Sequence, residues 1–233
     1  MDLIVEGITR AFWLLVKGDR EVFRIALLTL KVSGTATLIS LAIGVPLGTV
    51  LALARFRGRT AVASLINTGM GLPPVVVGLW VSIMLWRYGP LGHLRLLYTP
   101  TAMVIAQTLI ALPIVTGLTM SGIGQLDEGI RVQVLSLGAT RLQLVWLLVR
   151  EARLAILAAV IAGFGRAVSE IGASMMVGGN VVGQTRVLTT ATSMEVSRGN
   201  FGTAIALSLV LMGISLCITA FLTHLQQKGR SST

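Results

Sequence analysis

Long apolar windows separated by short basic segments form the main pattern along this chain of 233 residues. A helix needs about 20 predominantly apolar residues to cross the hydrocarbon core of a bilayer. Five windows reach that length: 25–54, 64–86, 100–122, 203–223, and one that starts near Leu154 and runs past Glu170. The pattern therefore predicts an all-α integral membrane protein with five transmembrane helices.

Prolines and pairs of small residues lie inside several of these windows. The prolines are Pro46, Pro73, Pro74 and Pro113. Proline at membrane depth frees a carbonyl group and kinks the helix, so these windows favour a structure with a cavity over a plain bundle. Small residues four positions apart, Gly44 with Gly48 and Gly165 with Ser169, predict places where helices approach closely.

Two segments outside the windows are amphipathic. Residues 3–17 are too short to span, and their apolar side chains recur near helical spacing, which predicts a helix lying on the membrane surface. Residues 123–153 form a connection far longer than a helical bundle needs. Its apolar stripe and Gly138 predict two helical pieces that must bury this stripe against each other, the membrane or another protein.

Composition supports the membrane assignment and excludes several other classes. The chain is 54% hydrophobic and 12% charged, whereas soluble domains average about a quarter charged. Its net charge of +10 comes from basic residues near span ends, which favours lipid headgroups over nucleic acid. The single Cys217 excludes an internal disulfide, and the distant His93 and His224 make a metal site unexpected.

The segment RFRGR, residues 55–59, follows the first window directly and is typical of a cytoplasmic loop. With five spans, the loop 123–153 and the C-terminus then also lie in the cytoplasm. The N-terminus lies outside, and Trp86 and Tyr88 suit the outer aromatic belt.

Arg166 and Glu170 are charges placed where the membrane core is expected. They stand four residues apart, so a continuous helix would place them on one face. An unpaired charge at this depth costs at least about 2.5–3.5 kcal/mol, so each should be paired or face water. Two hypotheses remain: an intramembrane ion pair that locks the span, or a pathway for an anion together with Ser169, Pro73 and Pro74.

The stretch SLGATRLQLVWLLVREARLAILAAVIAGFGRAVSEIGASMMVGG resembles the cytoplasmic loop and following span of permease subunits of type I ABC importers. That family's loop motif is written EAA, three residues, Gly, nine residues, Ile-x-Leu-Pro. Gly138 matches its glycine, with Ala139 and Thr140 in the usual small positions. The flanks depart from the motif, because VQV (132–134) and LVRE (148–151) replace its two ends.

Further segments, among them NTGMGLPPVVVGL, GFGRAVSEIG and TRVLTTA, are similar to those of tungstate-importer permeases, with molybdate permeases as near relatives. The resemblance covers roughly residues 20 to 225. It implies an interfacial helix at 1–20, a type I ABC permease domain at 21–226 with its coupling loop at about 123–153, and a cytoplasmic tail at 227–233.

The resemblance also implies partners and a location in the bacterial inner membrane. Two copies of the chain would form a pathway for tungstate, or alternatively for molybdate or another oxyanion. A periplasmic binding protein would deliver the ion, and two cytoplasmic ATPase subunits would bind ATP and Mg²⁺. The residues expected to couple to the ATPase are Gly138, Ala139, Thr140, Arg141 and Leu144. The chain lacks the phosphate-binding sequence G-x-x-x-x-G-K-[ST], so it is expected to be non-catalytic and to carry no cofactor itself.

The outer segment 176–200 offers donors suited to a tetrahedral oxyanion. Asn180, Arg186, Thr189 and Thr190 are its candidates for the periplasmic opening of the pathway, and the alternative is a solvated loop that only contacts the binding protein. Two other classes of protein are alternatives for the whole chain. A stand-alone secondary transporter would often show inverted repeats, which five unequal spans do not. A membrane anchor would leave the kinks and Arg166 with Glu170 unexplained.

Overall fold

The computed structural model describes residues 19–230 together with Val5, Ile8, Thr9 and Trp13. Within this part of the chain every regular element is a helix, which confirms the predicted class. The interfacial helix predicted at residues 1–20 lies almost entirely outside the described residues and stays a prediction.

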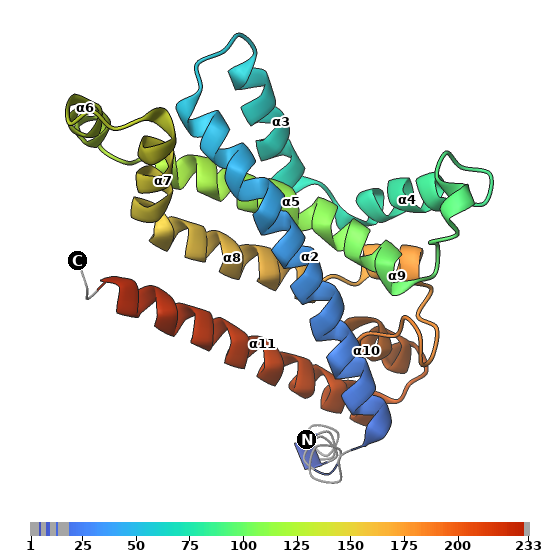
Figure 1. Ribbon diagram of the computed structural model, residues 1–233. Helices are drawn as coiled ribbons and strands as arrows, with labels where there is room; N and C mark the ends of the chain where they lie inside the picture. The colour runs from blue at the N-terminus through green and yellow to red at the C-terminus, as the bar shows by residue number, and fades with distance from the viewer. Residues whose placement is uncertain (1–4, 6–7, 10–12, 14–18, 231–233) are drawn as a thin grey trace.

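Three helices are long and apolar enough to cross a bilayer without interruption: α2 (Arg20–Leu53), α5 (Pro100–Gly124) and α11 (Phe201–Arg230). They confirm the predicted spans at 25–54, 100–122 and 203–223, although α2 and α11 extend further. α2 and α5 continue through Pro46 and Pro113 and cross each other near the centre of the molecule (Figure 1).

The other two predicted spans are each broken into two helices. Window 64–86 becomes α3 (Arg59–Gly71) and α4 (Pro74–Leu85), bent by 102°, and the fourth window becomes α8 (Arg153–Val168) and α9 (Gly172–Gly178), bent by 58°. The first break follows from Pro73 and Pro74, which lack N–H groups and hold Leu72 in an extended conformation with ψ of 133°. If each bent pair crosses once, the predicted five spans are reached.

Short helices gather at opposite ends of α5 (Figure 1). At one end α6 (Glu128–Ser136) and α7 (Arg141–Glu151) follow α5 and precede α8. At the other end the 3-10 helix η1 (Gly92–Leu94) precedes α5, and α10 (Leu188–Ser197) packs beside α11. The chain is therefore divided into two polar ends joined by the long helices.

Two glycines allow α2 to lie against α5. A Cβ atom at Gly44 would lie 2.9 Å from Val115 Cγ1, and one at Gly48 would lie 2.6 Å from the carbonyl oxygen of Thr116. The predicted close contact at Gly44 and Gly48 is thereby confirmed. The same prediction for Gly165 is not met within this chain, because a Cβ atom added there would meet nothing within 4 Å outside its own helix.

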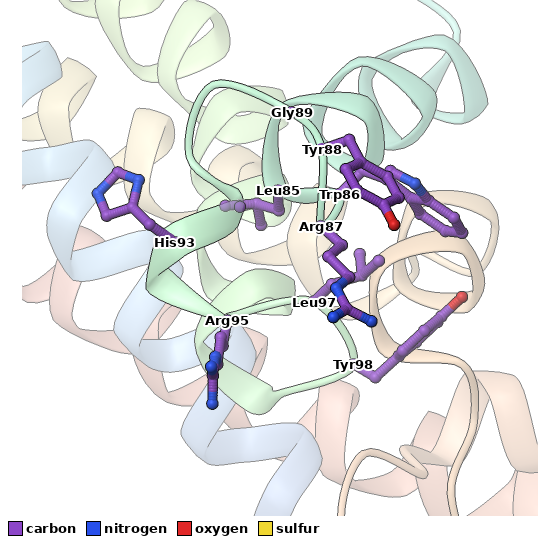
Figure 2. A pocket seen from close by; sticks show the side chains of 10 residues that line it. Leu85, Trp86, Arg87, Tyr88, Gly89, His93, Arg95, Leu97 and Tyr98 are labelled. Atoms are coloured by element: carbon purple, nitrogen blue, oxygen red, sulfur yellow. The ribbon is translucent and has the colours of Figure 1, made fainter.

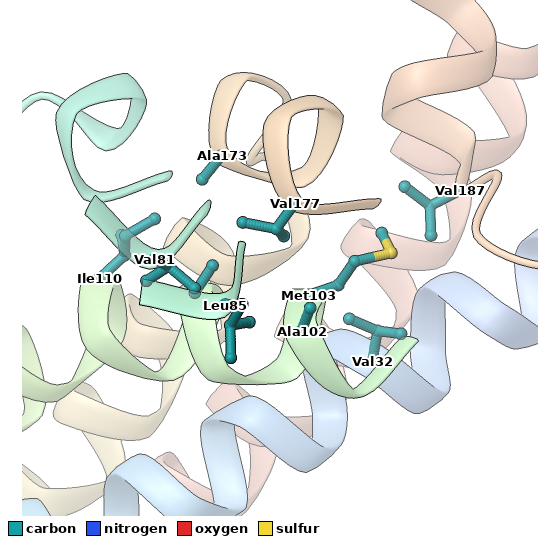
Figure 3. Packing of buried hydrophobic residues seen from close by; sticks show 10 residues of the cluster. Val32, Val81, Leu85, Ala102, Met103, Ile110, Ala173, Val177 and Val187 are labelled. Carbon is teal, nitrogen blue, oxygen red and sulfur yellow. The ribbon is translucent and has the colours of Figure 1, made fainter. Parts of the chain in front are cut away.

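A buried apolar cluster fixes the broken helices to α5 (Figure 3). Its members come from α2, α4, α5, α9 and the segment before α10: Val32, Val81, Leu85, Ala102, Met103, Ala106, Ile110, Ala173, Val177 and Val187. Because α4 and α9 both contribute, this core holds the helices that follow the two breaks against α5.

Candidate functional site

The two helix breaks meet where α4 and α9 begin. A Cβ atom at Gly172 would lie 2.6 Å from Val75 Cγ2, and one at Gly78 would lie 2.6 Å from the Cα atom of Ala173. These separations leave no room for a side chain, so glycine at both positions permits the contact. Segments 72–75 and 169–172 therefore form one region, and this region is the candidate site.

Glu170 lies in the second break and is buried, with 6% of its surface exposed. Its Oε1 atom accepts a hydrogen bond from the Ala173 N–H at 2.9 Å, and its main-chain carbonyl accepts one from the Thr189 hydroxyl at 3.0 Å. A carboxylate in this position satisfies an N–H that has no partner within the helix and interacts favourably with the helix dipole. Glu170 therefore fixes the start of α9.

Arg166 lies in the last turn of α8 and is half-buried. The three ion pairs found among the described residues do not include it. The predicted helix face shared by Arg166 and Glu170 is wrong, because α8 ends at Val168 and Glu170 caps α9 instead. Of the two hypotheses, an internal pair between these residues is not formed, and the role of Arg166 in a pathway stays a prediction.

The backbone at both breaks is exposed on the surface of the chain. Leu72 is 43% exposed and Ile171 is 42% exposed. Pro73 and Ser169 are also exposed, whereas Pro74 is half-buried as the first residue of α4. Non-helical backbone at membrane depth is tolerated only where protein covers it or water reaches it. This face is therefore expected to meet water or another chain rather than lipid.

The residues predicted for the outer opening bond within the chain instead of facing solvent. Asn180, Thr189 and Thr190 are buried at 5%, 4% and 0% exposure. The Thr190 hydroxyl donates to Asn180 Oδ1 at 3.0 Å, and Arg186 forms an ion pair with Glu21 of α2 at 3.7 Å. These contacts hold the segment before α10 against α9 and α2. Whether any of the four meets an ion stays a prediction.

The bend predicted at Gly138 is confirmed, since Gly138 separates α6 from α7 with φ of +82° and open space around its Cα atom. Glycine adopts this conformation without the steric cost that a side chain adds. Thr140 then starts α7 through a reciprocal capping box with Gln143. Of the other predicted coupling residues, Arg141 is exposed, and Ala139 and Leu144 are half-buried.

The apolar stripe of loop 123–153 is largely uncovered by the chain itself. Its exposed members are Val132 at 66%, Leu135 at 48%, Leu137 at 81%, Leu142 at 79% and Trp146 at 62%. Trp146 lies four residues after Leu142 and so shares its helix face. Leu148, by contrast, is fully buried.

Three segments predicted to share one side of the membrane lie at the same end of the molecule. Arg55, from RFRGR, forms an exposed ion pair with Glu128 at the start of α6, with an N–O distance of 3.6 Å. Gln226 near the end of α11 donates a hydrogen bond to the Leu154 carbonyl at 3.0 Å. The described residues contain no cluster of His, Cys, Asp or Glu suited to a metal ion.

Among the known proteins that this chain resembles, three relatives of nearly equal length illustrate the range of similarity. The chain is 43% identical to the tungstate uptake system permease protein TupB of Peptoclostridium acidaminophilum over 98% of this chain and 100% of that protein. It is 41% identical to a probable anion ABC transporter permease protein of Haloferax volcanii over 84% and 87% of the two chains. It is 26% identical to the molybdenum transport system permease protein ModB of Escherichia coli over 87% and 93%.

A solved structure of the MetNI methionine ABC transporter in an inward-facing conformation shares the fold. Its TM-score is 0.70 at 22% identity, over 95% of this chain and 97% of the other. Residues 44–231 match the family model described as the binding-protein-dependent transport system inner membrane component. With its broken spans and its exposed helical loop, this chain belongs to that family of transporter membrane subunits.

Proposed function

We propose that this chain is the permease subunit of an ATP-driven tungstate importer in which two copies form the pathway. The observation that supports the substrate is the 43% identity to a tungstate permease, against 26% to a molybdenum permease. Molybdate is the second candidate because the two oxyanions are nearly equal in size. The binding protein delivers the ion from outside, and the permease provides a route for it.

The pathway runs beside the exposed helix breaks, where the two copies face each other. Supporting this placement, Leu72 and Ile171 expose irregular backbone that lipid does not satisfy. The guanidinium group of Arg166 supplies positive potential to a dianion passing this face. Asn180, Arg186, Thr189 and Thr190 keep the outer end of α9 in place, and Glu170 holds its inner end.

The ATPase subunits dock on the exposed surface of α6 and α7. A supporting feature is that Leu137, Leu142 and Trp146 remain uncovered on a helical loop that bends at Gly138. ATP and Mg²⁺ belong to the ATPase, whose closure moves α6 and α7 and, through α8, the break at Glu170. The end that contains Arg55, α6 and α7 lies on the cytoplasmic side of the bacterial inner membrane, together with the C-terminus. The N-terminus lies on the outer side.

The test is reconstitution of this chain in liposomes with its ATPase and its binding protein. ATP hydrolysis is measured with tungstate, molybdate and sulfate added separately at equal concentration. We expect tungstate to stimulate hydrolysis at the lowest concentration, molybdate to follow and sulfate to have little effect. Stimulation by sulfate alone would reject the proposed substrate class, and transport without any ATPase would favour a secondary transporter.

A further inference from the structure

Loop 86–98, which joins α4 to α5, forms an open cavity of about 980 Å³ at the end of α5 remote from α6 and α7. Its walls include two arginines and three aromatic residues: Trp86, Arg87, Tyr88, Arg95 and Tyr98. Figure 2 shows the guanidinium groups of Arg87 and Arg95 projecting to the same side of the loop, with His93 on the other side. The position corresponds to the outer face in the orientation proposed above.

The loop is held in a defined conformation. The Leu91 N–H donates to the Met84 carbonyl at 2.9 Å, and the Tyr98 N–H donates to the Val177 carbonyl of α9 at 2.8 Å. Arg95 and Tyr98 both adopt the left-handed conformation, with φ of +51° and +62°. Such conformations in residues other than glycine persist where the surrounding structure enforces them, often at binding sites. The arginines are thus presented on a fixed backbone.

Among the residues that the structure describes, no acidic side chain forms an ion pair with the arginines of this cavity. Neither Arg87 nor Arg95 belongs to the ion pairs found among the described residues. The sequence contains no Asp or Glu between Arg59 and Asp127, so no residue near these arginines along the chain can neutralise them. Arg87 lies 5.9 Å from the ring centroid of Tyr88, which orients its guanidinium without removing its charge.

We propose that Arg87 and Arg95 hold a tetrahedral oxyanion group, either a free oxyanion or the phosphate of an anionic lipid headgroup. Guanidinium groups bind such oxygens through paired, charge-assisted hydrogen bonds, and the Tyr88 and Tyr98 hydroxyls are additional donors. Trp86 and Tyr88 place the cavity at headgroup depth, where both sources are present. An open cavity with two arginines in its lining suits a compact anionic group better than the broad surface of a protein.

The test uses purified full-length protein and the double variant R87Q/R95Q. The control is R20Q/R24Q, which removes the same charge from exposed arginines of α2 that do not line this cavity. Binding of sodium tungstate and of sodium phosphate is titrated in neutral detergent. Binding of phosphatidylglycerol is measured in nanodiscs of phosphatidylcholine with and without that lipid.

We expect R87Q/R95Q to weaken binding at least about tenfold, equivalent to ~1.4 kcal/mol, while R20Q/R24Q leaves it unchanged. Loss confined to the detergent titrations identifies a free oxyanion, and loss confined to the nanodiscs identifies a lipid phosphate. The variant R87K/R95K keeps the charge but not the planar fork, and we expect intermediate binding even if the glutamine variant folds poorly.

Three results overturn the proposal. Equal losses in R87Q/R95Q and R20Q/R24Q would indicate a general charge effect, and unchanged binding in both would indicate no site. If binding is unchanged and R87Q/R95Q also loses stimulation of ATP hydrolysis by the binding protein in the reconstitution described above, the loop is a protein-docking surface instead. Because the binding titrations need neither ATPase nor transport, they fail or succeed independently of the proposed function.

Discussion

Two substitutions of Glu170 distinguish a role in capping α9 from a role for the negative charge, because glutamine removes only the charge and leucine removes the hydrogen-bond acceptor as well. Glutamine keeps an oxygen that can accept from the Ala173 N–H, now 2.9 Å from Oε1, whereas leucine removes the acceptor. A hydrogen bond to a charged group contributes about 1.5–3 kcal/mol and a neutral one about 0.5–1.5 kcal/mol. Glutamine therefore costs about 1–1.5 kcal/mol, and leucine, which leaves a buried N–H unsatisfied, costs up to about 3 kcal/mol.

For a chain of this size, each kcal/mol changes Tm by about 2–4 °C. We therefore expect Glu170→Gln to lower Tm in detergent by about 2–6 °C and to keep most ATP-driven uptake. Glu170→Leu should lower Tm by more than glutamine does, up to about 12 °C, and abolish uptake, because α9 loses its fixed start. Differential scanning fluorimetry and uptake into proteoliposomes measure both effects. Equal losses for glutamine and leucine would refute the capping role and show that the charge itself is required.

Three further substitutions test the packing, the loop and the pathway. Gly48→Ala places a Cβ atom 2.6 Å from a carbonyl oxygen of α5 and should destabilise the protein by about 1–3 kcal/mol. The control Gly34→Ala, in open space on the same helix, should not destabilise it, and equal Tm values of the two variants would contradict the close crossing of α2 and α5. Gly138→Val forces a β-branched residue into φ of +82° and should weaken ATPase binding at least about tenfold in pull-down titrations. The control Gly124→Val, where an added Cβ atom meets nothing within 4 Å, should leave the affinity unchanged, and equal affinities of the two variants would exclude the bend as a coupling element. Arg166→Gln should lower tungstate uptake at least about tenfold with little change in Tm, and Arg166→Lys should restore part of it; a large loss of Tm would point to a structural partner instead.

The long helices could be predicted from the sequence because length and hydropathy alone define a span. The break after Leu72 has a local cause in Pro73 and Pro74, and the bend at Gly138 has one in the freedom of glycine. The break between α8 and α9 has no comparable local signal. It depends on the Glu170 side chain turning back to Ala173 and on Thr189 reaching the Glu170 carbonyl across the fold.

The outer residues show the same limit in another form. In the sequence, Thr190 and Asn180 are polar residues available to an ion. In the fold, the segment between α9 and α10 brings them together, and the Thr190 hydroxyl donates a hydrogen bond to Asn180 Oδ1. Conversely, Arg87 and Arg95 are isolated basic residues in the sequence and form no recognisable motif there. Only the folded loop brings them to one cavity and shows that they lack acidic partners among the described residues.

The position at which the ATPase contacts this chain tests the proposed coupling most directly. Cys217 is the single native cysteine, so a Cys217→Ser background allows one new cysteine at exposed Leu142 on α7 or at exposed Leu94 in the remote loop. In the assembled complex we expect the cysteine at 142, but not the one at 94, to cross-link to the ATPase in high yield. Cross-linking from 94 alone, or from neither position in a complex that hydrolyses ATP, would contradict docking of the ATPase on α6 and α7.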